Sequence, residues 1–173
     1  MRMKDLNFLA IDFETANHDP TSACAVGLCK VRNGKIAQTT KYLIRPPHRS
    51  FYFAYLHGIR SEDVRKSPDF REVWEGRVVP ALEDAAFLAA HHASFDRRVI
   101  YESCEHFGTE LPQKLFVCTV QLARDFLGIR PANLPNVAAA LEIELQHHDP
   151  ASDAEACARI VIEAAKRGWK PGY

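Results

Sequence analysis

The sequence predicts an α/β fold built on a mixed sheet. Residues 1–44 hold three short runs rich in β-branched and aromatic side chains, the composition typical of strands. From residue 61 onward, stretches with apolar residues at helical spacing alternate with two short apolar runs. Strands that come first and then alternate with helices favour a sheet that packs against helices.

The expected strands are marked by their composition and by the turns between them. Asn33-Gly34 is a strong two-residue hairpin signal between the second and third strands. Pro46-Pro47 ends the third strand, and the two later runs are short enough for buried strands. The expected strands are residues 7–13, 24–32, 35–44, 87–90 and 115–118.

The expected helices begin at polar residues and end at glycines, which are favoured positions for both. Ser94 is expected to cap a helix that Gly108 ends, and Gly128 closes the next one. The expected helices before residue 130 start near residues 61 and 68 and cover 94–107 and 119–127.

The last helix has the clearest signals. Asp149 can cap it, Pro150 suits the first helical position, and Gly168 follows its end. An apolar stripe at helical spacing predicts that it docks along one face. The stripe is Ala154, Cys157, Ala158, Val161 and Ala165.

Composition excludes several classes of protein. The 173 residues fit a single domain over 1–173, and 47% hydrophobic with 25% charged residues is an ordinary globular composition. Twenty-two basic and 22 acidic residues give no net charge, which excludes a sequence-blind electrostatic binder of nucleic acid. No apolar run is long enough to span a membrane, and the first residues do not resemble a secretory signal, so we expect a cytoplasmic protein.

Five cysteines form an odd set without a Cys-x-x-Cys pair. They lie inside apolar segments, at positions 24, 29, 104, 118 and 157. We interpret them as reduced core thiols, with a structural zinc site as the alternative.

Asp12 and Glu14 stand two residues apart at the end of an apolar strand. A strand has a side-chain period of two, so both carboxylates point to one face. If the strand ends at Asp12, both acids face water. Otherwise they repel each other unless a divalent cation such as Mg²⁺ or Mn²⁺, which prefers oxygen ligands, lies between them.

Two further acids stand where helices are expected to start. Asp96 lies one turn into the helix after the strand at 87–90, where an acid also suits the helix dipole. Asp153 lies one turn into the last helix, and His148 stands five residues before it. Taken alone, Asp96 is explained by the helix dipole, and Asp153 and His148 fit solvated surface positions. Together the four acids mark element ends, which an α/β sheet gathers into one crevice.

This combination of motifs resembles the DEDD exonucleases of the DnaQ-like family. Ile11-Asp12-Phe13-Glu14-Thr15 is similar to the first motif, 90–96 to the second and 148–153 to the third, so the resemblance covers nearly the whole chain. His148 stands five residues before Asp153, and this spacing resembles that of the DEDDh branch of the family. One departure is His92, which stands where members commonly have asparagine.

The resemblance implies a ribonuclease-H-like sheet of about five strands with helices on both sides. It also implies a two-metal 3′–5′ exonuclease that releases nucleoside 5′-monophosphates from single-stranded or frayed ends. The two ions would be Mg²⁺ or Mn²⁺, and His148 would be the general base that accepts a proton from the attacking water. The implied metal ligands are Asp12, Glu14, Asp96 and Asp153, with Asp12 shared between the ions.

The resemblance also implies contacts to the terminal nucleotides. His57-Gly58-Ile59 is similar to a segment that lies beside the terminal nucleotide in members of the family. The period of two instead directs the Phe13 side chain away from Asp12 and into the core, which leaves a backbone contact. The implied substrate-binding residues are Phe13, Thr15, Ala16, His57, Ile59, His92 and Phe95.

Two other functions fit the same residues. One is a nucleic-acid-binding or scaffolding module of the same fold, and the other is a two-metal phosphatase that acts on small phosphates. The sequence does not separate DNA from RNA as the substrate. The expected partners are the 3′ end of a nucleic acid, a second copy in a homodimer, or a polymerase or repair protein. A chain that ends soon after its last helix favours a free-standing enzyme.

Overall fold

The computed structural model describes residues 2–172, which contain a five-stranded mixed sheet with strand order β3-β2-β1-β4-β5. β2 pairs antiparallel with β1 and β3, whereas β4 pairs parallel with β1 and β5. The strands are β1 (Phe8–Thr15), β2 (Ala23–Arg32), β3 (Lys35–Leu43), β4 (Phe87–Ala90) and β5 (Leu115–Cys118). The predicted mixed sheet is therefore confirmed.

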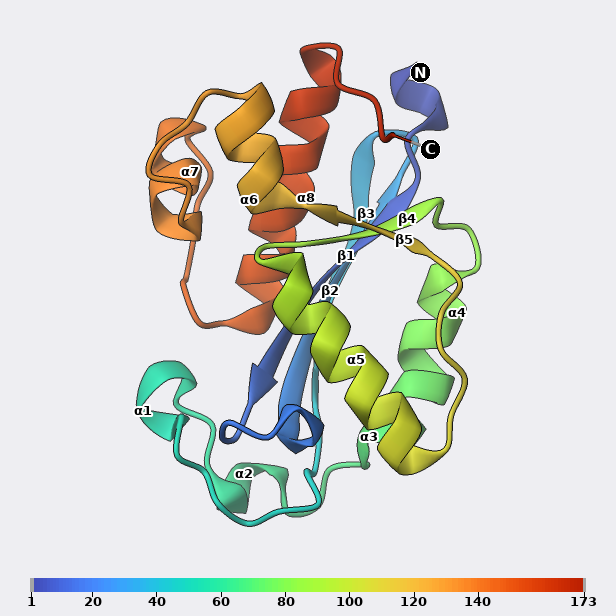
Figure 1. The fold of residues 1–173 in the computed structure, drawn as a ribbon, viewed down its shortest axis with the longest axis vertical. Coiled ribbons are helices and arrows are strands. Elements are labelled where there is room, and N and C mark those ends of the chain that lie inside the picture. The colour runs from blue at the N-terminus through green and yellow to red at the C-terminus, as the bar shows by residue number, and fades with distance from the viewer. Residues whose placement is uncertain (1, 173) are drawn as a thin grey trace.

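Helices cover both faces of this sheet (Figure 1). One face carries α3 (Phe70–Val73), α4 (Val79–Leu82) and α5 (Ala93–Phe107). The other carries α6 (Thr119–Gln121), α7 (Leu134–Ala140) and α8 (Pro150–Lys166). Two short helices, α1 (Ala54–His57) and α2 (Ser61–Val64), lie in the connection between β3 and α3. Two helical layers around one sheet confirm the predicted architecture.

The alternation of side chains along β1 explains where its acids point. Leu9, Ile11 and Phe13 belong to the core beneath α3 and α5. Phe8 and Ala10 belong to the core beneath α8. Asp12 and Glu14 continue the second set, so both carboxylates lie on the α8 side of the sheet. The strand does not end at Asp12, because its pairing with β2 continues to Thr15.

One local expectation was wrong, and another was right about the helix but not about its type throughout. Ser94 does not cap α5: the helix begins at Ala93, and His92 is the cap residue in a left-handed conformation with φ 59°. Histidine is enriched among the residues that adopt this conformation, as asparagine is, which accounts for His92 at this position. The helix expected over 119–127 is α6 followed by a π-helical turn over Leu122–Phe126.

α7 was not expected from the sequence. Its signals were nevertheless present, because the Asn133 side chain accepts a hydrogen bond from the Asn136 N–H and Pro135 lies in its first turn. The neighbouring Pro131 and Pro135 gave the segment the composition of a loop.

Gly27 on β2 lets α8 approach the sheet. It pairs with Asp12 on β1. A Cβ at Gly27 would lie 1.8 Å from the Pro150 carbonyl oxygen and 2.6 Å from the Ala151 nitrogen. The first turn of α8 therefore rests directly on the β2 backbone, next to the strand that carries Asp12.

We predict that Gly27→Ala lowers stability by about 1–3 kcal/mol, the usual cost of overpacking, because backbone rather than a flexible side chain must move. The substitution should also displace Asp153, which lies in the same turn of α8. Thermal unfolding measures the loss of stability. The matched control is Gly76→Ala, where an added Cβ meets nothing within 4 Å. Equal behaviour of the two variants would contradict the prediction.

Two expectations from composition can be compared with the structure. Within residues 2–172, no helix combines the length and apolar character needed to cross a membrane. All five cysteines are free thiols, four of them buried and Cys118 half-buried. Neither of the two groups of potential metal ligands in the described part of the chain contains a cysteine, in agreement with core thiols.

Candidate active site

Three carboxylates converge where β1 meets the first turn of α8. Asp12, Glu14 and Asp153 each offer an oxygen atom, and these oxygens all lie within 4.8 Å of one another. Two features of the fold produce this spacing. The period of two places both β1 acids on the α8 side, and the α8 backbone packs closely at Gly27.

Asp153 is buried, with 3% of its surface exposed. Its Oδ2 accepts a hydrogen bond from the His148 backbone N–H at 3.1 Å, and Nδ1 of His147 lies 3.0 Å from the same oxygen. Its Oδ1 is buried and has no hydrogen-bond partner among residues 2–172. A buried polar atom without a partner is costly, so this oxygen is available to a ligand.

Asp96 lies nearby in the first turn of α5 and is 1% exposed. Its Oδ1 accepts a hydrogen bond from the Phe13 backbone N–H at 3.0 Å, which joins the start of α5 to β1. Its Oδ2 is a second buried oxygen for which the described part of the chain offers no partner. Asp96 does not belong to the closely spaced set of three, although its charge acts on Asp12.

Burial raises the pKa of all four carboxyl groups, and repulsion from neighbouring acids adds to it at Asp12 and Glu14. Desolvation is the main cause in each case. It acts with the charges of Asp96 and Asp153 to hold the pKa of Asp12 well above its usual range. It raises the pKa values of Glu14 and Asp96 to about 8. The pKa of Asp153 is also raised, although its hydrogen bonds with His148 and His147 oppose the shift.

A divalent cation fits this donor set. Carboxylate oxygens are the ligands that Mg²⁺ and Mn²⁺ prefer. A cation would offset the repulsion between the acids that helps to raise the pKa values of Asp12 and Glu14. The unpartnered oxygens of Asp96 and Asp153 would also gain a partner. The residues present therefore fit the divalent metal expected from the sequence, while the identity and number of ions stay predictions.

We predict that the ion-free protein becomes less stable as pH rises from about 4 to about 8. The four carboxyl groups have raised pKa values in the folded state and ordinary values near 4 when unfolded. The folded state therefore binds more protons over this range, and stability falls as pH rises. In EDTA, Tm should be higher at about pH 5.5 than at about pH 8.5, by at least roughly 2–4 °C.

The control for this pH series is the same measurement with Mn²⁺, which should raise Tm more at the higher pH. A Tm in EDTA that rises between the two pH values would contradict the assignment of a crowded, uncompensated acidic site.

His148 lies at the mouth of the same site. Its backbone has a positive φ of 68°, and its ring stacks on that of His147 with centroids 3.9 Å apart. Desolvation and the neighbouring His147 lower the pKa of His148 below its usual value of 6.5, so it is largely neutral at physiological pH. Nitrogen atoms of both histidines lie within 4.8 Å of an Asp153 oxygen.

These groups line a cleft with a volume of about 530 Å³. Of the predicted substrate contacts, Phe13, His92 and Phe95 line this cleft. Phe13 is buried in the core as expected, whereas Phe95 is 45% exposed and offers an aromatic face. The residues that line the cleft are Asp12, Phe13, Glu14, His91, His92, Ser94, Phe95, Asn133, Leu134, Pro135, His147, His148 and Asp153.

The other predicted substrate contacts, Thr15, Ala16, His57 and Ile59, are not among these lining residues. Ala16 is fully buried, and its backbone N–H and C=O bond to Ser22 and Phe53.

His57 instead forms hydrogen bonds with neighbouring backbone groups. Its Nδ1 accepts a hydrogen bond from the Ile59 N–H, so Nε2 carries the proton and donates to the Thr15 carbonyl at 3.2 Å. These bonds hold α1 against the end of β1.

Sequence reasoning missed His91, Ser94, Asn133, Leu134, Pro135 and His147 as lining residues. His147 had a signal, since it is the other half of a His-His pair that precedes the α8 cap. His91 is anchored by Thr119, whose Oγ1 lies 2.9 Å from His91 Nδ1, and burial lowers the pKa of His91 to about 4. The three residues from 133 to 135 belong to the start of α7, which was itself unexpected.

The mixed sheet and the acidic cleft at the ends of β1, α5 and α8 define the class of protein as a ribonuclease-H-like α/β domain. A family model described as "Exonuclease" matches residues 9–161. The chain belongs to this exonuclease family, which confirms the resemblance found in the sequence.

Curated relatives carry nuclease or polymerase names. The chain is 28% identical to the 3′-5′ exonuclease DinG of Bacillus subtilis, over 95% of its own length and 18% of the relative. It is 29% identical to exodeoxyribonuclease 10 of Escherichia coli over 80% of its length and 60% of that protein. It is also 29% identical to a PolC-type DNA polymerase III of Listeria monocytogenes, of which it spans 12%. The chain thus corresponds to part of each relative.

Solved structures share the fold. Exonuclease X in complex with 5′ overhanging duplex DNA superposes with a TM-score of 0.74 at 24% identity, with 94% of both chains covered. The nuclease domain of 3′hExo, described as a DEDDh family member bound to rAMP, has a TM-score of 0.79 at 16% identity. That match covers 94% of this chain and 92% of the other.

Proposed function

We propose that this chain is a DEDDh-type, metal-dependent 3′–5′ exonuclease that releases nucleoside 5′-monophosphates. The observation that carries the proposal is the convergence of Asp12, Glu14 and Asp153 within 4.8 Å, beside the buried Asp96 carboxylate. Membership of the exonuclease family supports the reaction class. Relatives named as 3′-5′ exonuclease and exodeoxyribonuclease support nucleic acid as the substrate.

The four acids would hold the metal, with Asp12, Glu14 and Asp153 at one position and Asp12 with Asp96 at a second. When bound, two divalent ions supply a nucleophile at neutral pH and stabilise charge on the attacking and leaving oxygens. Asp96 is oriented by its hydrogen bond from the Phe13 N–H, and Asp153 by the His148 N–H. These bonds fix the carboxylates before any ligand arrives.

His148 would be the general base. Its lowered pKa leaves the imidazole neutral near pH 7, the form that accepts a proton from the attacking water. His147 would be a positioning residue, because its Nδ1 contacts Asp153 and its ring stacks on His148. Phe95 would contact a terminal base, since its exposed ring lines the same cleft.

The test uses end-labelled DNA and RNA oligonucleotides of matched sequence, incubated with Mn²⁺, with Mg²⁺ and with EDTA. We expect a 3′-end ladder of mononucleotide steps that EDTA suppresses. Unchanged oligonucleotide with a shifted band on a gel would instead support a binding or scaffolding module. Turnover of mononucleotides but not of oligonucleotides would support a small-phosphate hydrolase. Cytoplasmic location, homodimer formation and a polymerase or repair partner stay predictions.

A further inference from the structure

The segment between β3 and α3 has a net positive charge, unlike the rest of the chain. Residues 45–66 contain five Lys/Arg residues and only two acidic ones, Glu62 and Asp63, although the whole chain has no net charge. None of its arginines forms an ion pair with another described residue. The five basic residues are Arg45, Arg49, Arg60, Arg65 and Lys66.

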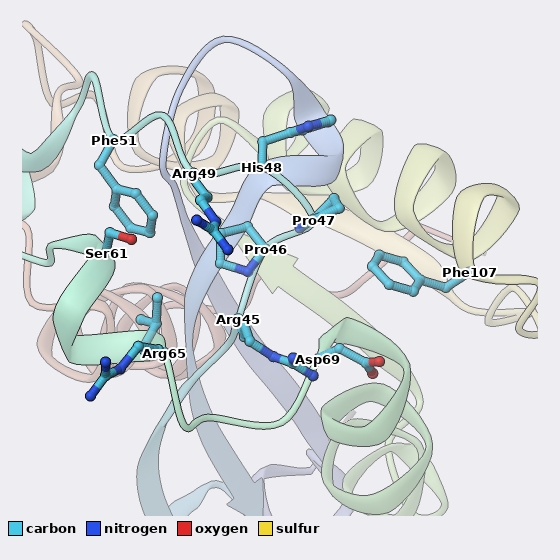
Figure 2. A pocket seen from close by; sticks show the side chains of 11 residues that line it. Arg45, Pro46, Pro47, His48, Arg49, Phe51, Ser61, Arg65, Asp69 and Phe107 are labelled. Atoms are coloured by element: carbon cyan, nitrogen blue, oxygen red, sulfur yellow. The ribbon is translucent and has the colours of Figure 1, made fainter.

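Three of these arginines surround a groove. Arg45, Arg49 and Arg65 are exposed and line a hollow of about 650 Å³. Figure 2 shows that they start from separate points of the chain: Arg49 is directed over the hollow, Arg45 toward Asp69 and Arg65 outward at its edge, with the Phe51 and Phe107 rings on its two sides. We call this the arginine groove. Its one acidic lining residue, Asp69, caps α3 through the Glu72 N–H. Unpaired guanidinium groups in a hollow of this kind suit phosphate.

A group of aromatic residues directly follows the first groove residues in the sequence. Tyr52 and Tyr55 are 62% and 72% exposed. The Tyr52 ring contacts those of His18, Phe53 and Tyr55, with centroids 5.4–6.1 Å apart. We call these four rings the aromatic patch. Large exposed rings with free faces are what unpaired bases stack on, whereas a duplex hides its base faces.

Hydrogen bonds tie the aromatic patch to the strand that carries the catalytic acids. The Phe53 N–H donates to the Ala16 carbonyl, and the Asn17 side chain donates to the Ser50 carbonyl. Ala16 is two residues after Glu14, or about 7 Å along an extended chain. Residues 50–53, which join the first groove residues to the aromatic patch, are therefore bonded directly to residues 16–17, next to the acids of β1.

We propose that the aromatic patch and the arginine groove bind the single-stranded stretch of nucleic acid that precedes the 3′-terminal nucleotide. The proposal rests on the proposed function. Bases stack on Tyr52 and Tyr55, and backbone phosphates bind Arg45, Arg49 and Arg65. A strand that reaches this surface binds more tightly than one that fills the cleft alone.

The first test measures binding in EDTA, which prevents hydrolysis of the strand. Fluorescence anisotropy compares strands of about three and about 12 nucleotides. We expect the triple variant Arg45→Gln/Arg49→Gln/Arg65→Gln to weaken binding of the longer strand about tenfold or more. The salt dependence of log Kd should flatten by about 0.7 for each phosphate that the variant no longer binds. Tyr52→Ala/Tyr55→Ala should also weaken binding about tenfold, with little change in the salt dependence.

The matched control is Arg159→Gln/Lys166→Gln/Arg167→Gln. It removes the same charge from the exposed side of α8, where these residues pair with Glu155 and Glu163. An equal loss of binding in this control would overturn the proposal, because net charge alone would then explain the effect. Equal binding of a duplex of the same length, with the same sensitivity to the tyrosine variants, would overturn the assignment to unpaired strands.

A second test separates this proposal from the proposed function. Hydrolysis of a dinucleotide and of the longer strand is measured with Mn²⁺. We expect the groove and patch variants to lower kcat/KM for the longer strand about tenfold relative to the dinucleotide. If the wild-type protein hydrolyses both substrates and the variants leave their ratio unchanged, the proposed surface is wrong and the exonuclease assignment stands. If the wild-type protein hydrolyses neither, the proposed function itself fails.

Discussion

Replacement of Asp12 by asparagine is expected to abolish metal-dependent hydrolysis while it raises the thermal stability of the ion-free protein. Asp12 is the carboxylate that both proposed metal positions share. Loss of one member of such a catalytic unit commonly costs about 10⁴-fold in rate or more. Binding of Mn²⁺, measured by titration calorimetry, should weaken with it.

The opposite effect on stability follows from the surroundings of Asp12. Desolvation and the charges of Asp96 and Asp153 raise its pKa well above the usual range, so its ionised form opposes folding when no cation is present. Asparagine has nearly the same shape and no charge. In EDTA at about pH 8, the Tm of the variant should exceed that of the wild type. The difference should shrink toward acid pH, because the wild-type carboxyl is then protonated in the folded state and opposes folding less.

The matched control is Asp125→Asn, which removes an exposed carboxylate that pairs with Arg124 on the surface. It should change neither hydrolysis nor Mn²⁺ binding. An Asp12→Asn variant that binds Mn²⁺ as tightly as the wild type would show that Asp12 is not a ligand. A lower Tm in EDTA would show that the carboxylate stabilises the fold through contacts other than those described.

The acids of β1 could be predicted from sequence because a strand has a strict period. Residues two apart on a strand share one face, and the apolar Phe8 and Ala10 on the same face as Asp12 indicate that this face is buried. The sequence contains no comparable rule for the distance between β1 and α8. That distance depends on Gly27, which pairs with Asp12 from the neighbouring strand and has no side chain to mark its role. A glycine within a strand indicates a close backbone approach, but not which element approaches.

The neighbours of the acids were harder to predict for a similar reason. His147 and His148 have equal sequence signals, and only the turn before α8 decides which ring contacts Asp153. The role of His92, which stands where members of the family commonly have asparagine, could not be predicted either. Asp96 bonds to the Phe13 N–H, and His92 supplies the left-handed residue that precedes α5. Backbone conformation at such positions depends on tertiary contacts, which a pattern of residue types does not encode.

The two neighbouring histidines should give separable variants. His148→Ala is expected to lower the rate by about 10²–10⁴-fold, the usual contribution of a general base. Mn²⁺ affinity should stay close to that of the wild type, because the four carboxylates remain. His147→Ala should lower the rate less than about tenfold, since Asp153 keeps its bond from the His148 backbone N–H.

The pH profile distinguishes a base from a residue that only shapes the site. Below its pKa His148 is protonated and cannot accept a proton, so the wild-type rate should fall toward acid pH. Because desolvation lowers this pKa below 6.5, the fall should begin below that value. His148→Ala should lose this acid limb, and His147→Ala should keep it. Added imidazole should restore part of the rate to His148→Ala, because it can enter the cleft and accept the proton.

Metal binding provides the remaining comparison. Nitrogen atoms of both histidines lie within 4.8 Å of an Asp153 oxygen, so the same residues could also hold a cation directly. If His148 is a ligand rather than a base, His148→Ala should weaken Mn²⁺ binding in parallel with the rate, and a higher Mn²⁺ concentration should restore activity. If it is a base, saturating Mn²⁺ leaves the rate low. The two roles therefore predict opposite responses to one titration.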